Sequence, residues 1–258
     1  MVGARPGYRV PVRADDTAQF ALLDVQAQDS AIAQLTHRRN SLPELVVIAD
    51  LEERRRELDG TRIESDTEVS DLTRQQKKAD AEVEQVKTRR TRDEERLSSG
   101  MISNPKDLES LQHELVALER RISTLEDEEL EVMEHLEEAQ TQLSAITADL
   151  ESVDSNLAAA VGARDAAVVE IDGQLDGARA DRQMVLANVP DDLLALYEKI
   201  RVNKGGLGAA ALRARSCEGC RLELNAADMR DLAAAPENEV LRCPECDRIL
   251  VRTAEAGI

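Results

Sequence analysis

Four cysteines, arranged as two Cys-x-x-Cys pairs, are the only cysteines in the sequence. Cys217 and Cys220 form the first pair, Cys243 and Cys246 form the second, and 22 residues separate the two pairs. In each pair the second thiolate can return toward the first across a tight turn, and four thiolates are a preferred ligand set for zinc. A redox pair, an iron–sulfur site or two disulfides are the alternatives. Two matched pairs at this separation favour one structural Zn²⁺ ion with no open coordination position.

The residues around the two pairs fit metal-binding turns. Gly219 lies inside the first pair, where we expect backbone to approach sulfur closely and φ to be positive. Pro244 stiffens the second pair, and Asp247 follows it at a position where Asp tolerates a left-handed conformation better than most residues. Four thiolates around one zinc ion leave net negative charge. We expect nearby arginines to offset it: Arg215, Arg221, Arg242 and Arg248.

The rest of the chain must position this site, and its composition indicates long helices rather than a globular enzyme. The 258 residues carry a net charge of −19, are 33% charged and contain only 1% aromatic residues. No apolar run approaches the roughly 18 residues of a membrane span, and no signal peptide is visible. We therefore expect a soluble, cytoplasmic protein, where paired cysteines are more often metal ligands than disulfides.

A sustained heptad repeat in the second half of the chain predicts a coiled coil. Its apolar residues alternate steps of three and four, and only Glu129 interrupts them. The run is too long and its flanks too charged for an ordinary core helix. The repeat consists of Leu108, Leu111, Leu115, Leu118, Ile122, Leu125, Glu129, Val132, Leu136, Ala139, Leu143, Ile146, Leu150, Val153, Leu157 and Ala160.

The first half carries the same period more weakly, from Leu45 to Leu97, and a short connection joins the two halves. Gly100 and Asn104-Pro105 are helix stoppers, with Asn104 as N-cap of the next helix. We therefore predict an antiparallel hairpin with its tip near residues 98–105. Charges suggest a pairing in which Arg89 faces Glu114 and residues 54–56 face Asp149.

These signals divide the chain into three parts. Residues 1–14 are expected to be flexible, residues 15–203 to form the hairpin, and residues 204–258 to form a zinc ribbon. Pro43 predicts a kink near residues 40–43, so that the segment before it folds against the far end of the second long helix. A short helix is expected to follow Pro190. The fold class is thus mostly α, a long antiparallel coiled-coil hairpin followed by a small C-terminal zinc ribbon.

At the end of a heptad hairpin, "CEGCRLEL" and "CPECDRIL", preceded by "GGLGAAAL", resemble a family of bacterial proteins. Its members carry a C4-type zinc ribbon after a long N-terminal coiled-coil hairpin, and they include a Helicobacter flagellar-regulation protein and a chlamydial homologue. The resemblance covers essentially the whole chain. It implies a binding or chaperone-like protein; members of the family contact transcription or secretion machinery, and in places RNA. This chain departs from many members at Asp247 and Val251, where Gly and an aromatic residue are common.

Catalysis is not expected from the remaining residues. His37, His113 and His135 are isolated on predicted helices, and "KGGLG" lacks the preceding strand and the following Lys-Ser/Thr of a phosphate loop. The acidic run "EDEELEVMEHLEE" is typical of a solvated coiled-coil face. We therefore predict a non-enzymatic protein with no small-molecule substrate and no membrane partner.

Two binding functions remain from the sequence. The first is a scaffold or adaptor that recognises protein partners through its coiled coil and ribbon. The second is nucleic-acid binding by the ribbon and its basic approach segment, but the ribbon is nearly neutral and no aromatic lies beyond Tyr197 for base stacking. Protein binding is favoured. The candidate contacts are Arg201, Lys204, Arg213, Arg215 and Arg221.

Overall fold

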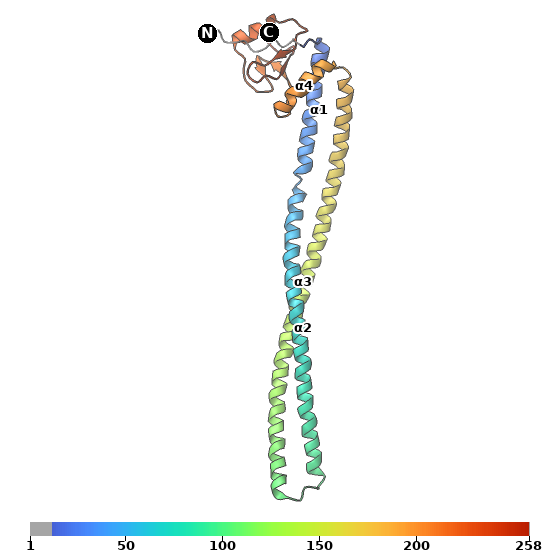
Figure 1. Ribbon diagram of the computed structural model, residues 1–258, viewed down its shortest axis with the longest axis vertical. Coiled ribbons are helices and arrows are strands. Elements are labelled where there is room, and N and C mark those ends of the chain that lie inside the picture. The colour runs from blue at the N-terminus through green and yellow to red at the C-terminus, as the bar shows by residue number, and fades with distance from the viewer. Residues whose placement is uncertain (1–11, 258) are drawn as a thin grey trace. The chain divides into compact units, whose positions relative to one another are not determined.

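The computed structural model describes residues 12–257, and most of them are helical (Figure 1). The predicted fold class, long helices that form a hairpin before a small strand region, is confirmed. The helices are α1 (Asp16–Asn40), α2 (Pro43–Ser98), α3 (Pro105–Leu186), α4 (Asp191–Asn203) and α5 (Ala226–Ala234). The strands are β1 (Ala209–Arg213), β2 (Ser216–Cys217), β3 (Leu241–Arg242) and β4 (Ile249–Arg252).

The chain forms two compact units. One unit runs from Glu44 to Gly162 and contains the hairpin of α2 with the first part of α3. The other joins the segment up to Pro43 with the chain from Ala163 onward. It therefore holds α1, the last part of α3, α4 and the strands.

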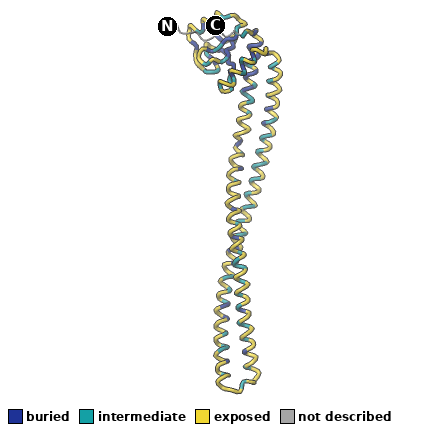
Figure 2. Tube along the Cα trace, viewed as in Figure 1, coloured by how far each residue is buried: buried dark blue, intermediate teal, exposed yellow. Residues whose placement is uncertain are grey.

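The hairpin unit is held by the predicted heptad seam. Every residue of the repeat from Leu108 to Ala160 is buried or half-buried, Glu129 included, while most of its neighbours are exposed (Figure 2). On α2, Leu58 and Val83 are buried, and Arg62 and Arg90 are half-buried at seam positions. A stripe of this spacing is what an antiparallel coiled coil buries.

The charge pairing across the hairpin is partly as predicted. Arg89 pairs with Glu114, as the sequence indicates. The pairing of residues 54–56 with Asp149 is wrong, because Arg55 Nε lies 2.6 Å from Oδ1 of Asp154. The apolar seam sets the register, and long arginine side chains reach acids about a turn away in either direction. The charges alone therefore could not determine the register of the hairpin.

The tip of the hairpin is built as its stop signals predict. α2 ends at Ser98, Gly100 adopts a φ of 70°, and α3 begins at Pro105. Asn104 caps α3, since its Oδ1 accepts a hydrogen bond of 3.1 Å from the backbone N–H of Lys106. Met101 is 84% exposed at this tip.

Glu129 is the acidic interruption of the seam, and its replacement is expected to stabilise the hairpin. A hydrogen bond with the Asp80 carboxyl raises the pKa of Glu129, and partial burial adds to this shift. Glu129→Leu removes the carboxyl and adds apolar seam contact, so we expect a gain of about 1 kcal/mol in the free energy of unfolding. Urea denaturation, monitored by the helical circular dichroism signal, measures this gain in the free energy of unfolding.

The stability that Glu129→Leu is expected to gain depends on pH. Because the pKa of Glu129 is higher in the folded protein, its ionisation disfavours folding above that raised pKa and has no such effect below its unfolded pKa. The advantage of Leu is therefore larger at neutral pH than in acid. Glu131→Leu, at an exposed position of α3, is the control and should give no such gain. A lower stability for Glu129→Leu would contradict the seam assignment.

In the other unit, four strands form one sheet in the order β2-β1-β4-β3. β1 runs parallel to β4 and antiparallel to β2, and β3 runs antiparallel to β4. Alternate residues of β1 face opposite sides of the sheet, as strand geometry requires. Each side of the sheet therefore covers its own apolar core.

One core joins the sheet to helices, and the other fills the ribbon. On the helical side, Ala209, Ile249 and Val251 pack with Leu22 and Val25 of α1 and with residues of α4. On the ribbon side, α5 and the cysteines cover the sheet. The members of this second core are Ala210, Leu212, Cys217, Leu224, Met229, Leu232, Leu241, Cys243, Leu250 and Ala256.

The predicted segment before Pro43 folds against the end of α3, as expected. Leu42 packs with Ile171 and Leu175 in a small core, and Arg39 Nε lies 2.8 Å from Oδ1 of Asp172. α1 ends at Asn40 and α2 begins at Pro43, which coincides with the predicted break.

The expected boundary at residue 203 differs from the observed division of the chain. α1, α4 and the sheet belong to one compact unit because a shared apolar core joins them. The expected flexible segment 1–14 lies outside the described residues as far as residue 11. Residues 12–14 are ordered against the ribbon: Val12 C=O accepts from Val240 N–H at 3.2 Å, and Ala14 N–H donates to Asn238 C=O at 2.9 Å.

Candidate metal centre

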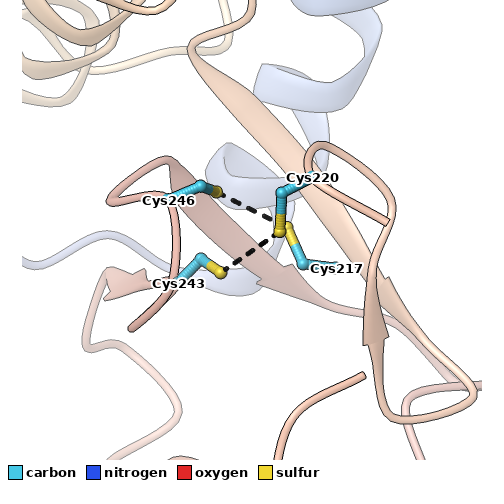
Figure 3. A group of neighbouring side chains, drawn as sticks. All are labelled: Cys217, Cys220, Cys243 and Cys246. Carbon is cyan, nitrogen blue, oxygen red and sulfur yellow. Dashed lines mark hydrogen bonds between the residues drawn. The ribbon is translucent and has the colours of Figure 1, made fainter. Parts of the chain in front are cut away.

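Two turns and the strands beside them bring the four cysteines together. Cys217 ends β2, and Cys220 follows it across the first turn. Cys243 follows β3, and Cys246 comes shortly before β4. Figure 3 shows that the four side chains point toward one another from these two turns. Cys217 and Cys243 are buried, whereas Cys220 and Cys246 are half-buried.

The distances between the sulfur atoms fit one tetrahedral ion. All four Sγ atoms lie within 4.8 Å of one another, and both Cys217–Cys246 and Cys220–Cys243 are separated by 3.9 Å. Zinc–sulfur bonds of about 2.3 Å in a tetrahedron place sulfurs about 3.8 Å apart. A disulfide requires about 2.05 Å, so the four thiols are free. The donor set and its spacing therefore match zinc.

The environment of the thiols is uneven. Burial raises the pKa of Cys217 and of Cys243. Burial also acts to raise the pKa of Cys246, but hydrogen bonds from the backbone N–H and the guanidinium of Arg248, with those of the neighbouring thiols, outweigh it and lower that pKa to about 7. The surroundings of Cys246 thus favour its thiolate form. A bound cation would favour the thiolate at all four.

The two turns close in the same way. Arg221 N–H donates to Cys217 C=O at 2.7 Å, and Asp247 N–H donates to Cys243 C=O at 2.9 Å. The residue after each pair is left-handed, with φ of 62° at Arg221 and 64° at Asp247. The conformation predicted for Asp247 is therefore present, and Arg221 is its counterpart.

The positive φ predicted for Gly219 is wrong. Among the described residues its φ is not one of the positive ones. Space explains the glycine instead, because a Cβ there would lie 2.9 Å from the Cβ of Ala210 and 2.9 Å from the Cδ of Arg248.

Arg221 is strained by its left-handed backbone, so its replacement by Gly is expected to stabilise the ribbon. A left-handed conformation costs a residue with a Cβ about 1 kcal/mol relative to Gly. We expect Arg221→Gly to raise the denaturation midpoint of the zinc-loaded ribbon, measured by urea titration with amide NMR signals of residues 210–252. Glu245→Gly, in the second turn but without positive φ, should leave it unchanged or lower it. Equal gains in both variants would contradict the strain.

The four arginines expected to offset the thiolates divide into two groups. Arg242 donates to the carbonyl of Asp247 at 2.6 Å, and Arg248 donates to two carbonyls before β1, those of Leu207 and Lys204. Arg215 and Arg221 are exposed, and neither forms an ion pair within the described residues. Only part of the expected compensation is therefore built into the fold.

The five candidate contact residues do not form one basic cluster. Arg201 pairs with Glu198 at 2.8 Å and is only 32% exposed. Arg213 pairs with Glu218 and Glu255 at 3.0 Å and 2.7 Å. Lys204 ends α4 as its C-cap. Arg215 and Arg221 are therefore the two exposed candidates without an acidic partner among residues 12–257.

A buried polar network near α4 was not predicted. Asp29 is 7% exposed and accepts a 2.6 Å hydrogen bond from the Tyr197 hydroxyl. Arg182 Nε donates to Asp29 at 2.7 Å, and Arg182 also pairs with Glu198. Burial is the main reason that the pKa of Tyr197 is raised, and its bond to Asp29 adds to this. A signal was present, because Asp29 interrupts an apolar stripe between Val25 and Ile32.

Gln26 extends this network to the start of β1. Its Oε1 accepts from Gly208 N–H at 2.7 Å, from Ala209 N–H at 3.3 Å and from the Tyr197 hydroxyl at 3.3 Å. Its Nε2 donates to the carbonyl of Gly206 at 3.1 Å. One side chain of α1 therefore contacts the segment that joins α4 to the sheet at Gly206, Gly208 and Ala209.

Within the described residues, no helix has a stretch that is both long and apolar enough to span a membrane.

Comparison with known proteins supports both parts of the structure. Residues 25–205 match the CT398-like coiled coil hairpin domain family, and residues 216–250 match the C4-type zinc ribbon domain family. An uncharacterized protein of Mycobacterium tuberculosis is 34% identical over 241 residues, which cover 93% of this chain and 98% of that protein.

Two solved structures share the fold. A Mycobacterium smegmatis structure has a TM-score of 0.81 at 33% identity and covers 93% of this chain and 100% of its own. The CT398 structure from Chlamydia trachomatis has a TM-score of 0.65 at 17% identity, covering 92% of this chain and 98% of its own. The chain therefore belongs to the CT398-like coiled coil hairpin family, and it carries a C4-type zinc ribbon at its C-terminal end.

Proposed function

We propose that the protein is a non-enzymatic adaptor in which one zinc ion orders the ribbon, and in which ribbon and hairpin together recognise a protein partner. The observation that carries the proposal is the convergence of four thiols at distances suited to a single tetrahedral ion. Such an ion has all its positions filled by protein and none left for a substrate or a water nucleophile. The metal then serves folding, and its surroundings serve recognition.

The charge of the chain supports a protein partner. With 52 acidic and 33 basic residues, the surface repels phosphate backbones in general. We place the protein in the cytoplasm, because a reducing compartment keeps four cysteines available to a metal. The relationship to CT398-like proteins supports the architecture, and the partner class, such as transcription or secretion machinery, is part of the proposal.

Binding of nucleic acid is the second candidate, and Arg215 with Arg221 is the observation that favours it. Both side chains are exposed beside the first turn and have no acidic partner among residues 12–257. Two arginines are few, since each phosphate contact contributes only modestly at physiological salt. The protein partner therefore remains the preferred function.

Crosslinking in native cell extract separates these two functions. The full chain, with a photoreactive group at Met101 or at Leu222, is compared with Cys243→Ser and with the double variant Arg215→Glu/Arg221→Glu. We expect the same crosslinked proteins with and without nuclease treatment, and fewer of them from the Leu222 probe in Cys243→Ser. Crosslinks that vanish with nuclease, together with a salt-sensitive gel shift that the double variant abolishes, would replace the adaptor by a nucleic-acid binder.

A further inference from the structure

Arg248 touches three separate segments around the metal centre. Its backbone belongs to the second turn, where its carbonyl accepts from Cys243 N–H at 2.9 Å. Its stem passes the first turn, since a Cβ on Gly219 would lie 2.9 Å from its Cδ. Its guanidinium leaves the ribbon: Nε donates to the carbonyl of Leu207, and Nη2 donates to that of Lys204, both at 3.0 Å.

The segment that Arg248 contacts, residues 204–208, is rich in glycine. Lys204 ends α4, and the two residues after it are glycines with φ of 67° and 91°. Glycines at such angles give a chain more freedom than any other residue. Apart from Arg248, the segment is held by backbone bonds from Gly206 N–H and Lys204 N–H to Arg201 C=O at 2.9 Å and 3.3 Å, and from Ile249 N–H to Gly208 C=O at 3.0 Å. The Gln26 side chain bonds to it as well.

Through this segment, the metal centre is connected to the buried network. Gln26 bonds to Gly206, Gly208 and the Tyr197 hydroxyl, and Tyr197 bonds to Asp29. Contacts therefore run from Cys243 through Arg248 and residues 204–208 to Gln26 of α1. A bound ion fixes both turns with respect to each other, and so fixes the point from which the guanidinium reaches out.

Arg242, an arginine beside the same turn, provides a comparison for Arg248. Its guanidinium bonds to the carbonyl and carboxylate of Asp247, in the turn itself. It bears the same charge and directly precedes Cys243, whereas Arg248 follows Cys246 by two residues. It makes no hydrogen bond to residues 204–208 within the described part of the protein.

We propose that Arg248 is a positioning residue that couples zinc binding at the four cysteines to the order of the joint at residues 204–208. The inference rests on the metal site proposed above, and it is independent of the identity of any partner. When the ion leaves, the turn that carries Arg248 is released, its two carbonyl bonds are lost and the glycine joint is freed. Because coupling is reciprocal, Arg248 in turn favours the zinc-bound ribbon.

Hydrogen exchange on the full chain, with and without zinc, tests the coupling. In the native protein we expect zinc removal to speed exchange of the Gly206, Gly208 and Ala209 amides at least tenfold. In zinc-loaded Arg248→Ala these amides should exchange about as fast as in the zinc-free native protein, while the Asp247 amide in the second turn stays protected by zinc. Arg242→Ala should keep zinc-dependent protection of the joint.

Zinc affinity, measured by competition with a chromophoric chelator, is the second readout. Removal of a residue that orients metal ligands typically weakens binding by about 10–100-fold, and we expect a loss in this range for Arg248→Ala. Arg248→Lys retains the charge but has one nitrogen for two carbonyls, so it should restore only part of both readouts. If Arg248→Ala fails to fold, Arg248→Lys takes its place in both measurements.

The outcomes are distinct. A native chain that binds no zinc would overturn the metal site itself and the coupling with it. A chain that binds zinc normally, but in which Arg248→Ala and Arg242→Ala give the same exchange and the same affinity, would overturn the coupling alone.

Discussion

Cys243→Ser is expected to unfold the ribbon while α2 and α3 remain helical. The removed thiolate is one of four that converge, and metal binding is coupled to folding in sites of this kind, with apparent binding free energies of about 10–16 kcal/mol. Leu212, Leu224 and Leu250 then lose the core that the cysteines complete. The ribbon contributes only α5, with 9 helical residues, whereas α3 alone has 82.

The loss should reach beyond the ribbon into α1. Ala209, Ile249 and Val251 of the sheet cover Leu22 and Val25, which would become exposed. We therefore expect amide signals of residues 205–256 and the first turns of α1 to lose dispersion, with a small decrease in helical circular dichroism. Chelation of the zinc-loaded native chain should reproduce this result. Glu245→Ser, an exposed change between the same two cysteines, should have little effect.

Two results would contradict this picture. Loss of most helical signal in Cys243→Ser would mean that the hairpin cannot fold without the metal centre. A fully dispersed ribbon spectrum after chelation would mean that apolar packing alone suffices to hold it.

Asp29→Ala is expected to cost about 3–5 kcal/mol in the unit that contains α1 and α4. Removal of one member of a buried ion pair leaves its partner without compensation, and losses of this size are typical. Asp29 is 7% exposed, and the Arg182 side chain paired with it is 17% exposed. The Tyr197 hydroxyl also loses its 2.6 Å acceptor.

A double-mutant cycle with Arg182→Ala separates the pair from its surroundings. Because each single change strands the other partner, the two losses should add to more than the loss in the double variant. Asp24→Ala, at an exposed position of the same helix, is the matched control and should change stability by less than about 0.5 kcal/mol. Unfolding of this unit is monitored by a spectroscopic signal of Tyr197 or by amide exchange in α4. A cost for Asp29→Ala no larger than the control would show that the network is not a stabilising one.

The parts of the fold that the sequence predicts well are those with local, periodic or covalent signals. The heptad repeat from Leu108 to Ala160 predicts which residues are buried because each position depends only on its own helix. The same is true of the stop at Gly100 and the cap at Asn104. The cysteine pairs are short motifs whose spacing already implies a metal site.

Contacts between distant segments could not be predicted in this way. Asp29 and Arg182 are 153 residues apart, and no local pattern links them. β1 contains Ala209, Ala210 and Ala211, a run with little strand preference, and its partner β4 lies beyond both cysteine pairs. The packing of α1 on the sheet changes the expected domain boundaries. This packing depends on contacts between segments that are far apart in the sequence, so only the folded structure reveals it.

The pairing of residues 12–14 with residues 238–240 has a consequence for biosynthesis. A ribosome that has made α1 must still translate both long helices and most of the ribbon before Asn238 and Val240 exist. At roughly 5–20 residues per second, this delay is on the order of ten to forty seconds. During that interval Leu22 and Val25 have no sheet to cover them. The nascent chain therefore carries the apolar stripe of α1 without its sheet through most of its own synthesis.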